Sequence, residues 1–364
     1  MAEHILSCAG HSTGIIGTVE NKVGREAASS DYTTPEPVQL HYLLSRMRKC
    51  GMSHGVMEVS SHALDQDRTY GILFQVGIFT NITVDHLDYH KTFEDYKNAK
   101  LKLFDQSKIC LANADSPCSN EFLSRNFAKS FSLKDEKADF YASDIGQAGQ
   151  YGQQYRVSYE GKVFPVTIQI PGLFNVYNSL AAFAAACLLG VDPEIAAEAL
   201  HSFEGVRGRM ERIKADVPYS IFIDFAHTPD GLLNLLQTAR QFTKNRIILV
   251  FGCGGDRDKS KRSMMGKIAQ IHCDIPVVTS DNPRNEDPNS IISDILSGFD
   301  DPKNVIAVAD RKEAIAQALS IAEEGDTVLV AGKGHEAYQI TKGKKIEFHE
   351  KEIILELLNQ RGQT

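Results

Sequence analysis

The chain has 364 residues, which predicts two or three domains with a sizeable core. Hydrophobic residues make up 42% and charged residues 24%, as in an ordinary globular protein. The formal net charge of −8, with no basic block, argues against a nucleic-acid binder and favours small-molecule partners.

The seven cysteines are scattered and form no C-x-x-C pair, so neither a disulfide framework nor a zinc site is indicated. No apolar run approaches the roughly 20 residues of a membrane-spanning helix, and the first residues lack a signal-peptide pattern. We therefore expect a cytoplasmic protein without a membrane span, and a monomer.

The first elements of the chain are a helix, a strand and a second helix. Residues Ala2 to Ala9 resemble the end of a helix closed by Gly10, and a strand is expected from Thr13 to Val19. Thr33 and Thr34 precede Pro35 in a polar turn before a helix from Glu36 to Cys50; from the pattern alone they could be N-cap residues and nothing more.

A buried strand is expected from Gly55 to Val59, ending near Glu58 and followed by Ser60. A carboxylate at the carboxyl end of a strand suits metal binding. The pattern is equally typical of a strand-end acid whose hydrogen bonds are satisfied within the protein.

A further helix is expected from Thr92, with Asp95 completing a capping box, to about Phe104. Lys100 falls near the centre of its apolar face, and Lys102 points the opposite way. A desolvated lysine loses proton affinity, so Lys100 could react with carbon dioxide to give a metal-ligating carbamate. Alternatively, its ammonium reaches solvent past the aromatic rings. The turn just upstream is crowded by Asp85, His86, Asp88 and His90.

Residues Leu111 to Phe174 carry short alternating runs that predict a small antiparallel patch, and an alanine-rich helix is expected from Asn178 to Leu189. Glycines between Glu204 and Gly208 indicate a hinge before a new domain.

In that domain, strands alternate with helical patterns, which predicts a parallel, doubly wound sheet. The expected strands are Ser220 to Phe225, Arg246 to Phe251, Pro276 to Ser280, Val305 to Ala309 and Thr327 to Ala331. Polar clusters follow four of them, namely DFAHTPDG, GCGGDRD, DNPR and GKGHE. Such strand ends converge on one crevice, so we expect a binding site there.

Motifs along almost the whole chain resemble those of the Mur ligases, most closely the branch that adds the third residue of the peptidoglycan stem peptide. They are TTPE, MEVSSHAL, TNITVDHLDYH, YKNAKLKLF, GLFNVYNSLAA, GRME, DFAHTPDGL, GCGGDRDKSKR, DNPR and GKGHE. The resemblance implies an α/β fold: a truncated central ATPase domain, residues 1–205, with a mostly parallel sheet and a small antiparallel patch, then a Rossmann-like doubly wound C-terminal ligase domain, residues 206–364.

The resemblance also implies roles for individual residues. It assigns the catalytic metal site to Glu58, His86 and carbamylated Lys100, and the UDP-MurNAc-dipeptide site to Thr33, Thr34, Ser60 and Arg68. It assigns ATP contacts to Asn175, Asn178, Asp224, His227 and Asp230. It assigns meso-diaminopimelate contacts to Arg257, Asn282, Arg284, Gly332 and Glu336.

The implied reaction is ATP-dependent amide formation through an acyl phosphate, with Mg²⁺ as cofactor and ATP as co-substrate. In DNPR, the arginine fork suits the second carboxylate of meso-diaminopimelate, which lysine lacks. A lysine-adding or folylpolyglutamate-type ligase is the alternative within the superfamily.

The chain departs from the family at one motif. No G-x-x-x-x-G-K-[ST] phosphate loop occurs in these 364 residues, and neither does the N-terminal domain that holds the uridine nucleotide in the family. The activity of these residues alone is therefore doubtful, and an inactive remnant or fragment that keeps substrate-binding surfaces is the second alternative.

Overall fold

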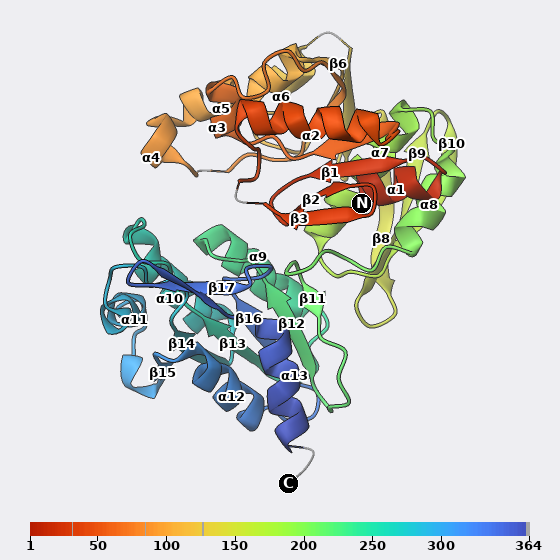
Figure 1. Cartoon of the computed structure of the whole chain (residues 1–364). Coiled ribbons are helices and arrows are strands. Elements are labelled where there is room, and N and C mark those ends of the chain that lie inside the picture. Colours follow the sequence, from red (N-terminus) through yellow and green to blue (C-terminus); the bar gives the residue numbers. More distant parts are fainter. Residues whose placement is uncertain (31, 84, 126, 362–364) are drawn as a thin grey trace. The chain divides into compact units, whose positions relative to one another are not determined.

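The computed structural model describes residues 1–30, 32–83, 85–125 and 127–361. The chain divides into two compact units, Met1–Glu204 and Gly205–Thr364. In Figure 1 the first runs from red to light green and the second from green to blue.

The first unit contains two sheets. The smaller has the order β3-β2-β1-β4, formed by β1 (Thr13–Ile16), β2 (Glu20–Val23), β3 (Glu26–Ser29) and β4 (His54–Met57). Strands β1 and β4 are parallel, whereas β2 and β3 add an antiparallel hairpin.

The larger sheet of this unit has the order β10-β9-β8-β7-β6-β5. Its strands are β5 (Phe74–Phe79), β6 (Ser107–Asn113), β7 (Ala128–Ser132), β8 (Phe140–Ala148), β9 (Gly152–Tyr159) and β10 (Lys162–Ile168). Strands β5 to β8 run parallel and β8 to β10 antiparallel.

Helices cover both faces of the larger sheet. The helices of the unit are α1 (Ala2–Cys8), α2 (Pro37–Lys49), α3 (Ser61–Asp65), α4 (Leu87–His90), α5 (Phe93–Asp105), α6 (Ser119–Leu123), α7 (Leu173–Leu188) and α8 (Pro193–His201). On one face α5 and α6 pack through Phe79, Phe104 and Phe122. On the other, the alanine-rich α7 packs with α1 and α8 against β6 to β10.

The predicted α/β class, with mostly parallel strands and antiparallel patches, is confirmed. Helix α5 begins where the capping box predicts, because Thr92 Oγ1 accepts a hydrogen bond from the Asp95 amide at 3.1 Å. The strand predicted from Thr13 to Val19 is wrong in extent: it ends at Ile16, and the hairpin that follows was missed. Helix α7 begins earlier than predicted, directly after Gly172, whose φ of 101° favours glycine.

The second unit is built on one six-stranded sheet of order β11-β12-β16-β13-β14-β15. Its strands are β11 (Glu211–Arg212), β12 (Ser220–Asp224), β13 (Ile247–Phe251), β14 (Ile275–Thr279), β15 (Ile306–Val308) and β16 (Thr327–Ala331). Strands β12 to β16 are parallel, so the predicted doubly wound sheet is confirmed. Strand β11 and the hairpin of β17 (Tyr338–Thr341) and β18 (Lys344–Glu347) were not predicted.

The helices of this unit also pack in two groups. They are α9 (Pro229–Arg240), α10 (Ser260–His272), α11 (Pro288–Leu296), α12 (Arg311–Ile321) and α13 (Glu350–Arg361), with a 3₁₀ turn at Pro302–Asn304. Helix α10 contacts α9 and α11, whereas α12 contacts α13 and the parallel strands. The interior strands β13 and β16 are completely buried between them.

Arg262 of α10 is buried and pairs with Glu286 at 2.9 Å and with Asp294 at 2.8 Å. The hydrogen bond from Arg262 lowers the pKa of Glu286 from 4.5 to about 2. Because this folded-state pKa is depressed, the ion pair stabilises the fold above pH 4.5, and its contribution is lost as the pH falls toward 2.

We therefore expect Glu286→Gln to lower the melting temperature at pH 7, with a difference from wild type that shrinks between about pH 4.5 and pH 3. Asp300→Asn is the matched control, because it removes an exposed pair with Lys267 and should change the melting temperature little. Calorimetry across this pH range checks both. A difference for Glu286→Gln that does not vary with pH would contradict the assignment.

Candidate functional site

In the first unit, polar side chains meet at the turn after β4. The Glu58 carboxylate accepts hydrogen bonds from Thr18 Oγ1 at 2.6 Å and from the Thr18 amide at 3.2 Å. The Thr18 hydroxyl also lies 3.0 Å from that of Thr33. Thr18 was missed by sequence reasoning because it fell inside the predicted strand, whereas it lies in the turn after β1.

Thr34 connects the remaining predicted residues of this turn. Its buried hydroxyl donates to the Glu58 carbonyl oxygen at 2.9 Å and accepts from the Ser60 amide at 3.0 Å. Arg68 donates to the Thr34 carbonyl oxygen at 3.0 Å and pairs with Glu36. Glu58, Thr33, Thr34, Ser60 and Arg68, which are far apart in the sequence, therefore form one hydrogen-bonded network through Thr18.

Lys100 and His86 lie beside the same aromatic ring. Lys100 Nζ is 5.2 Å from the centroid of the Tyr96 ring, and the His86 ring centroid is 5.7 Å from it. Lys100 is partly buried, and this burial lowers the pKa of its ammonium, as the desolvation argument requires. Lys97 is the more deeply buried lysine of α5 and pairs with Glu94 and Glu121.

The helical wheel predicts one buried face for α5, whereas the helix contacts both α3 and β6. Lys102, predicted to point away from the protein, is 3.3 Å from the Leu64 carbonyl oxygen and 3.7 Å from the Asp65 carboxylate at the end of α3. Two sides of α5 are therefore partly covered.

The three side chains expected to ligate a metal lie in two places: Glu58 at the turn after β4, and His86 and Lys100 beside the Tyr96 ring. Among the described residues, no group of three or more His, Cys, Asp or Glu side chains is placed to hold a metal ion. Glu58 supplies oxygen and His86 an imidazole, whereas an unmodified Lys100 amine adds no anionic ligand. With a carbamate on Lys100, Lys100 and Glu58 would both supply the oxygen ligands that Mg²⁺ prefers, whereas the His86 imidazole is a ligand more typical of transition metals.

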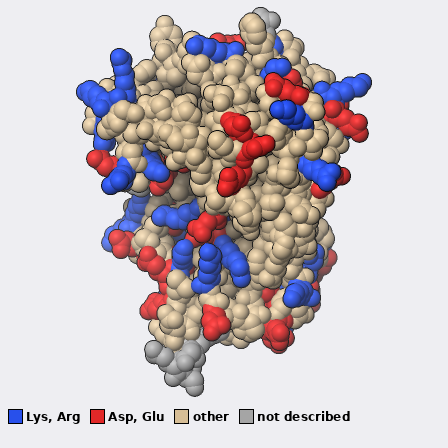
Figure 2. Space-filling model, turned by 90° about the vertical axis from the view of Figure 1, so that its right-hand side faces the viewer, with Lys and Arg blue, Asp and Glu red and all other residues tan. Residues whose placement is uncertain are grey.

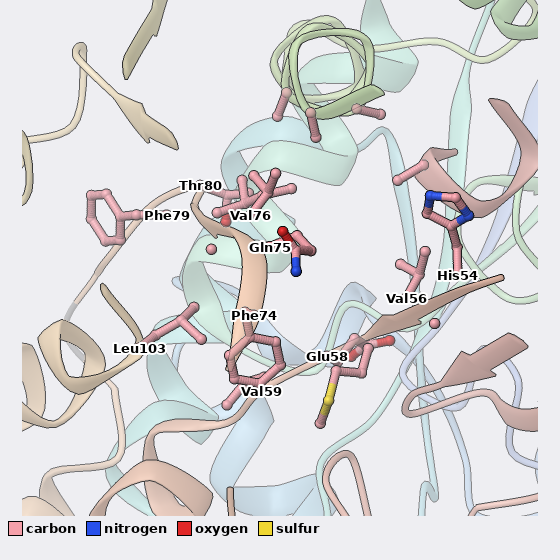
Figure 3. Close-up of a pocket in the computed structure, with 18 of the residues that line it drawn as sticks. His54, Val56, Glu58, Val59, Phe74, Gln75, Val76, Phe79, Thr80 and Leu103 are labelled. Carbon is pink, nitrogen blue, oxygen red and sulfur yellow. The ribbon is translucent and has the colours of Figure 1, made fainter. Parts of the chain in front are cut away.

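A cavity of about 660 Å³ in the first unit is lined by Glu58, among other residues. Figure 3 shows His54, Val56 and Glu58 on one side of it, and Phe74, Gln75, Val76 and Thr80 on the other. Lys100 of α5 and Asn178 of α7 also line it. The Asn178 side-chain nitrogen is 3.5 Å from the side-chain oxygen of Asn175, whose own amide donates to the Pro171 carbonyl oxygen.

In the second unit, Asp224 and His227 follow β12. The Asp224 carboxylate accepts from the amides of Met210 and Ala226 at 2.7 and 2.8 Å, and burial raises its pKa. Burial also lowers the pKa of His227, whose Nδ1 is 2.9 Å from the Phe225 carbonyl oxygen. Asp230 lies in the first turn of α9, where it accepts a hydrogen bond from Asn234.

A buried polar cluster joins the ends of β14 and β16. Asn282 donates to Glu336 Oε2 at 2.8 Å, and Lys333 donates to Asn282 Oδ1 at 3.0 Å. Lys333 is fully buried and pairs with Glu336 at 3.2 Å. Sequence reasoning missed Lys333, although it stands within the GKGHE motif.

Arg257 and Arg284 both approach Gly254: a side chain there would meet Arg284 Nη1 at 2.8 Å and Arg257 Cγ at 3.8 Å. Arg284 has φ 52° and donates to the Gly255 carbonyl oxygen at 2.7 Å. Gly332 approaches closely as well, since a side chain there would meet Asp281 Oδ2 at 2.5 Å. Two cations, Arg257 and Arg284, and the Asp281 carboxylate thus lie at the carboxyl ends of the parallel strands.

Buried Arg311 joins the carboxyl ends of β14 and β16. It donates to Glu350 Oε1 at 2.6 Å, to the Ser280 carbonyl oxygen at 3.1 Å and to the Ala331 carbonyl oxygen at 2.8 Å. Ser280 directly follows β14 and Ala331 is the last residue of β16. One guanidinium therefore positions the loops that carry Asn282 and Gly332.

Comparisons with known proteins match both units. The model for the Mur ligase middle domain matches residues 1–186, and that for the Mur ligase glutamate ligase domain matches residues 208–334. The chain belongs to the Mur ligase family. The UDP-N-acetylmuramoyl-L-alanyl-D-glutamate–2,6-diaminopimelate ligase of Clostridium perfringens is 46% identical over 97% of this chain and 74% of its own length. The ligase of that name from Aquifex aeolicus is 40% identical over 100% of this chain and 75% of its own length.

A solved structure of a named relative agrees with this assignment. A structure of a UDP-N-acetylmuramoyl-L-alanyl-D-glutamate–2,6-diaminopimelate ligase has 31% identity and a TM-score of 0.71, covering 100% of this chain and 76% of that one. A folylpolyglutamate synthase from Mycobacterium tuberculosis has 18% identity and a TM-score of 0.70, covering 91% of this chain and 84% of that one, and so shares the fold.

The face of the molecule shown in Figure 2 carries charges of both signs. On the face shown in Figure 2, Lys and Arg side chains are interspersed with Asp and Glu, and most of the surface is uncharged. Within the described ranges, no helix is long and apolar enough to cross a membrane.

Proposed function

We propose that this Mur ligase joins meso-diaminopimelate to UDP-N-acetylmuramoyl-L-alanyl-D-glutamate, with conversion of ATP to ADP and phosphate. The observation that carries the proposal is the 46% identity, over 97% of the chain, to a ligase named for these two substrates. The placement of Arg284 beside a second arginine agrees with an amino-acid substrate that has a second carboxylate.

The chemistry needs an activated carboxylate. Transfer of the ATP γ-phosphoryl group to the D-glutamate carboxylate forms an acyl phosphate and releases ADP. The diaminopimelate amine then attacks the acyl carbon, the new C–N bond forms as the C–O bond to phosphate breaks, and the amine loses a proton. Protein side chains contribute mainly by positioning the reactants and neutralising charge.

In the first unit, Thr33, Thr34, Ser60 and Arg68 bind the muramoyl dipeptide. This assignment is supported by their shared network around Glu58, which gives the turn little freedom to change shape. Asn175 and Asn178 at the start of α7 contact the nucleotide.

Glu58, His86 and carbamylated Lys100 hold Mg²⁺ in this proposal. When bound, Mg²⁺ would neutralise charge on the transferring phosphoryl group and the acceptor carboxylate. The lowered pKa of Lys100 supports the carbamate, because only the neutral amine reacts with carbon dioxide. The Glu58 carboxylate, which accepts a hydrogen bond from Thr18, would have to give up that bond to hold the ion.

In the second unit, Asp224, His227 and Asp230 contact the nucleotide, and Arg257, Asn282, Arg284, Gly332 and Glu336 bind diaminopimelate. Among these, Glu336 and Asn282 supply a carboxylate and an amide oxygen, which suit the far ammonium of diaminopimelate. Because Lys333 already occupies both, we propose that the substrate ammonium joins this cluster through the remaining Glu336 oxygen.

The experiment that tests the function uses a chimera that places, ahead of Met1, the N-terminal domain and the phosphate-loop segment that the family resemblance implies for the Clostridium perfringens relative. ADP formation is measured with the muramoyl dipeptide, Mg²⁺ and either meso-diaminopimelate or lysine. We expect turnover with diaminopimelate and little with lysine. A preference for lysine would support the lysine-adding alternative, and no turnover with either would support an inactive remnant.

Substrate choice is expected to depend on Arg284. Arg284→Ala should weaken the use of meso-diaminopimelate by about 2–3 kcal/mol, because a charged carboxylate loses its donor, and should leave the KM for ATP nearly unchanged. Arg240→Ala, which removes an exposed pair with Asp274, is the matched control and should have no effect. An equal loss with lysine as substrate would show that Arg284 does not read the second carboxylate.

A further inference from the structure

Lys333 is a buried cation to which the proposed function gives no role of its own. Its side chain is 0% exposed. Its Nζ lies 3.0 Å from Asn282 Oδ1, 3.2 Å from Glu336 Oε2 and 5.7 Å from the centroid of the Tyr338 ring. Burial of an ammonium group is costly unless other groups compensate for the lost water. Here the compensating contacts join the GKGHE loop to the DNPR turn.

The Asn282 side chain is held in one orientation by two donors. Its Oδ1 accepts hydrogen bonds from Lys333 Nζ and from the backbone amide of Ile340, both at 3.0 Å. An ammonium and a backbone N–H can only donate, so turning the amide over would place its NH₂ group against two donors. Its Nδ2 therefore faces the other way, where it donates to Glu336 Oε2 at 2.8 Å.

This orientation decides what Asn282 can offer a ligand. Both lone pairs of Oδ1 are in use, so the side chain can contribute only its second Nδ2–H, which is a donor. Arg284 is also a donor, and both residues contact Gly255. The Gly255 amide donates to the Asn282 carbonyl oxygen at 2.9 Å, and the Gly255 carbonyl oxygen accepts from Arg284 Nη1 at 2.7 Å. The DNPR turn thus presents two donors, which suit a carboxylate.

We propose that Lys333 is a positioning residue that determines substrate choice and acts through Asn282. Together with Ile340 it occupies Oδ1, and so directs Nδ2 toward the carboxylate that Arg284 binds. The inference rests on the proposed function, because it takes the second carboxylate of meso-diaminopimelate as the group bound there. Lysine lacks this carboxylate and gains nothing from the orientation.

A purely structural role for Lys333 makes a different prediction. If Lys333 only neutralised Glu336, its removal would lower the stability of the second unit and reduce the use of every substrate together. A role through Asn282 changes the use of meso-diaminopimelate and spares that of lysine and ATP. The two roles can therefore be separated by kinetics.

The test compares meso-diaminopimelate with lysine in the chimera. Lys333→Met keeps an apolar stem beside the Tyr338 ring and removes the ammonium. It should raise the KM for meso-diaminopimelate about tenfold or more, and change kcat, the KM for ATP and the use of lysine less than about threefold. Lys97→Met is the matched control. It removes another buried ammonium, paired with Glu94 and Glu121 in the first unit, and should leave the KM for meso-diaminopimelate unchanged.

Ile340→Pro tests the same orientation without removing a buried charge. Proline has no amide hydrogen, so the variant loses the second donor to Asn282 Oδ1. It keeps the carbonyl oxygen that accepts from the Arg284 amide. The KM for meso-diaminopimelate should rise at least about threefold. Glu347→Pro is the matched control, because the pair of Glu347 with Tyr338 lies two residues along the hairpin and its amide also faces away from the partner strand.

The orientation of Asn282 can also be measured without turnover. In the 364-residue chain labelled with ¹⁵N-asparagine, the Asn282 side-chain signal is identified by its absence from Asn282→Ala. Its amide hydrogens should exchange slowly with solvent in the wild type and about tenfold faster in Lys333→Met, because the amide is then free to turn over.

A double variant shows whether Lys333 acts through Asn282. In Asn282→Ala, the addition of Lys333→Met should raise the KM for meso-diaminopimelate less than about threefold further. Full additivity, an equal loss with lysine, or an unchanged KM in Lys333→Met beside an active wild type would overturn the inference. If Lys333→Met does not fold, an unchanged KM in Ile340→Pro would overturn it. A wild-type chimera that does not use meso-diaminopimelate would instead overturn the proposed function, and this inference with it.

Discussion

The 364-residue chain alone is expected to form ADP at least about a thousandfold more slowly than the chimera that carries a phosphate loop. A phosphate loop supplies backbone N–H groups, a lysine and a magnesium-binding hydroxyl to the transferring phosphate. Losing these contacts should cost several kcal/mol of transition-state stabilisation, and about 4 kcal/mol corresponds to this factor. The measurement is phosphate release with the muramoyl dipeptide, meso-diaminopimelate and Mg²⁺ present.

Turnover by the short chain within about tenfold of the chimera would refute this expectation, and would require another group in the 364 residues to hold the phosphates. A loop-deficient chimera, with the lysine of its phosphate loop changed to alanine, is the control. It should fall to the rate of the short chain, which separates the effect of the loop from that of added length.

The second large effect is expected at Lys100. In the chimera, Lys100→Ala should abolish turnover, because the substitution removes the amine that becomes the carbamate and with it a negative metal ligand. A short carboxylic acid added at high concentration should restore part of the activity by replacing the lost oxygens. The wild-type chain in ¹³C-bicarbonate should also show a carbamate carbon resonance that is absent from Lys100→Ala.

Lys102→Ala is the matched control for this experiment. Lys102 is on the same helix and contacts the end of α3, away from the Tyr96 ring that Lys100 and His86 share. Activity and the carbamate resonance should both survive in it. Wild-type-like turnover in Lys100→Ala, or an unmodified amine with Mg²⁺ bound, would rule out the carbamate.

Local chemistry made much of the fold predictable from the sequence. Thr92 predicts where α5 starts, because its hydroxyl accepts a hydrogen bond from an amide in the first turn, which has no carbonyl partner within the helix. The apolar runs of the second unit predict β12 to β16, and the alternation of strands with helices predicts their parallel order. The hairpin of β2 and β3 was missed because its residues, including Glu20, Asn21 and Lys22, lack the apolar alternation of a half-buried strand.

The candidate site could also be predicted only in part from the sequence. Its residue types were evident from motifs at strand ends, since the carboxyl ends of parallel strands converge whatever their separation in the chain. The contacts between these residues could not be predicted. Thr18 donates to Glu58, Lys333 donates to Asn282, and Arg311 donates to the backbone of two loops. Each of these hydrogen bonds joins segments that are far apart in the sequence. Such contacts depend on the sheet order and on burial, which no local pattern encodes.

The sequence by itself determined the family, the alternation of strands and helices, and the residues available for chemistry, because motifs and periodicity are properties of neighbouring residues. The tertiary structure alone decided that Lys100 lies beside the Tyr96 ring with His86 and that β4 and β5 end separate sheets around a cavity. The physical reason is that burial and strand pairing are set by partners distant in the chain. The apolar sequences of β4 and β5 indicate interior strands, and only the sheet order shows that each lacks a neighbour.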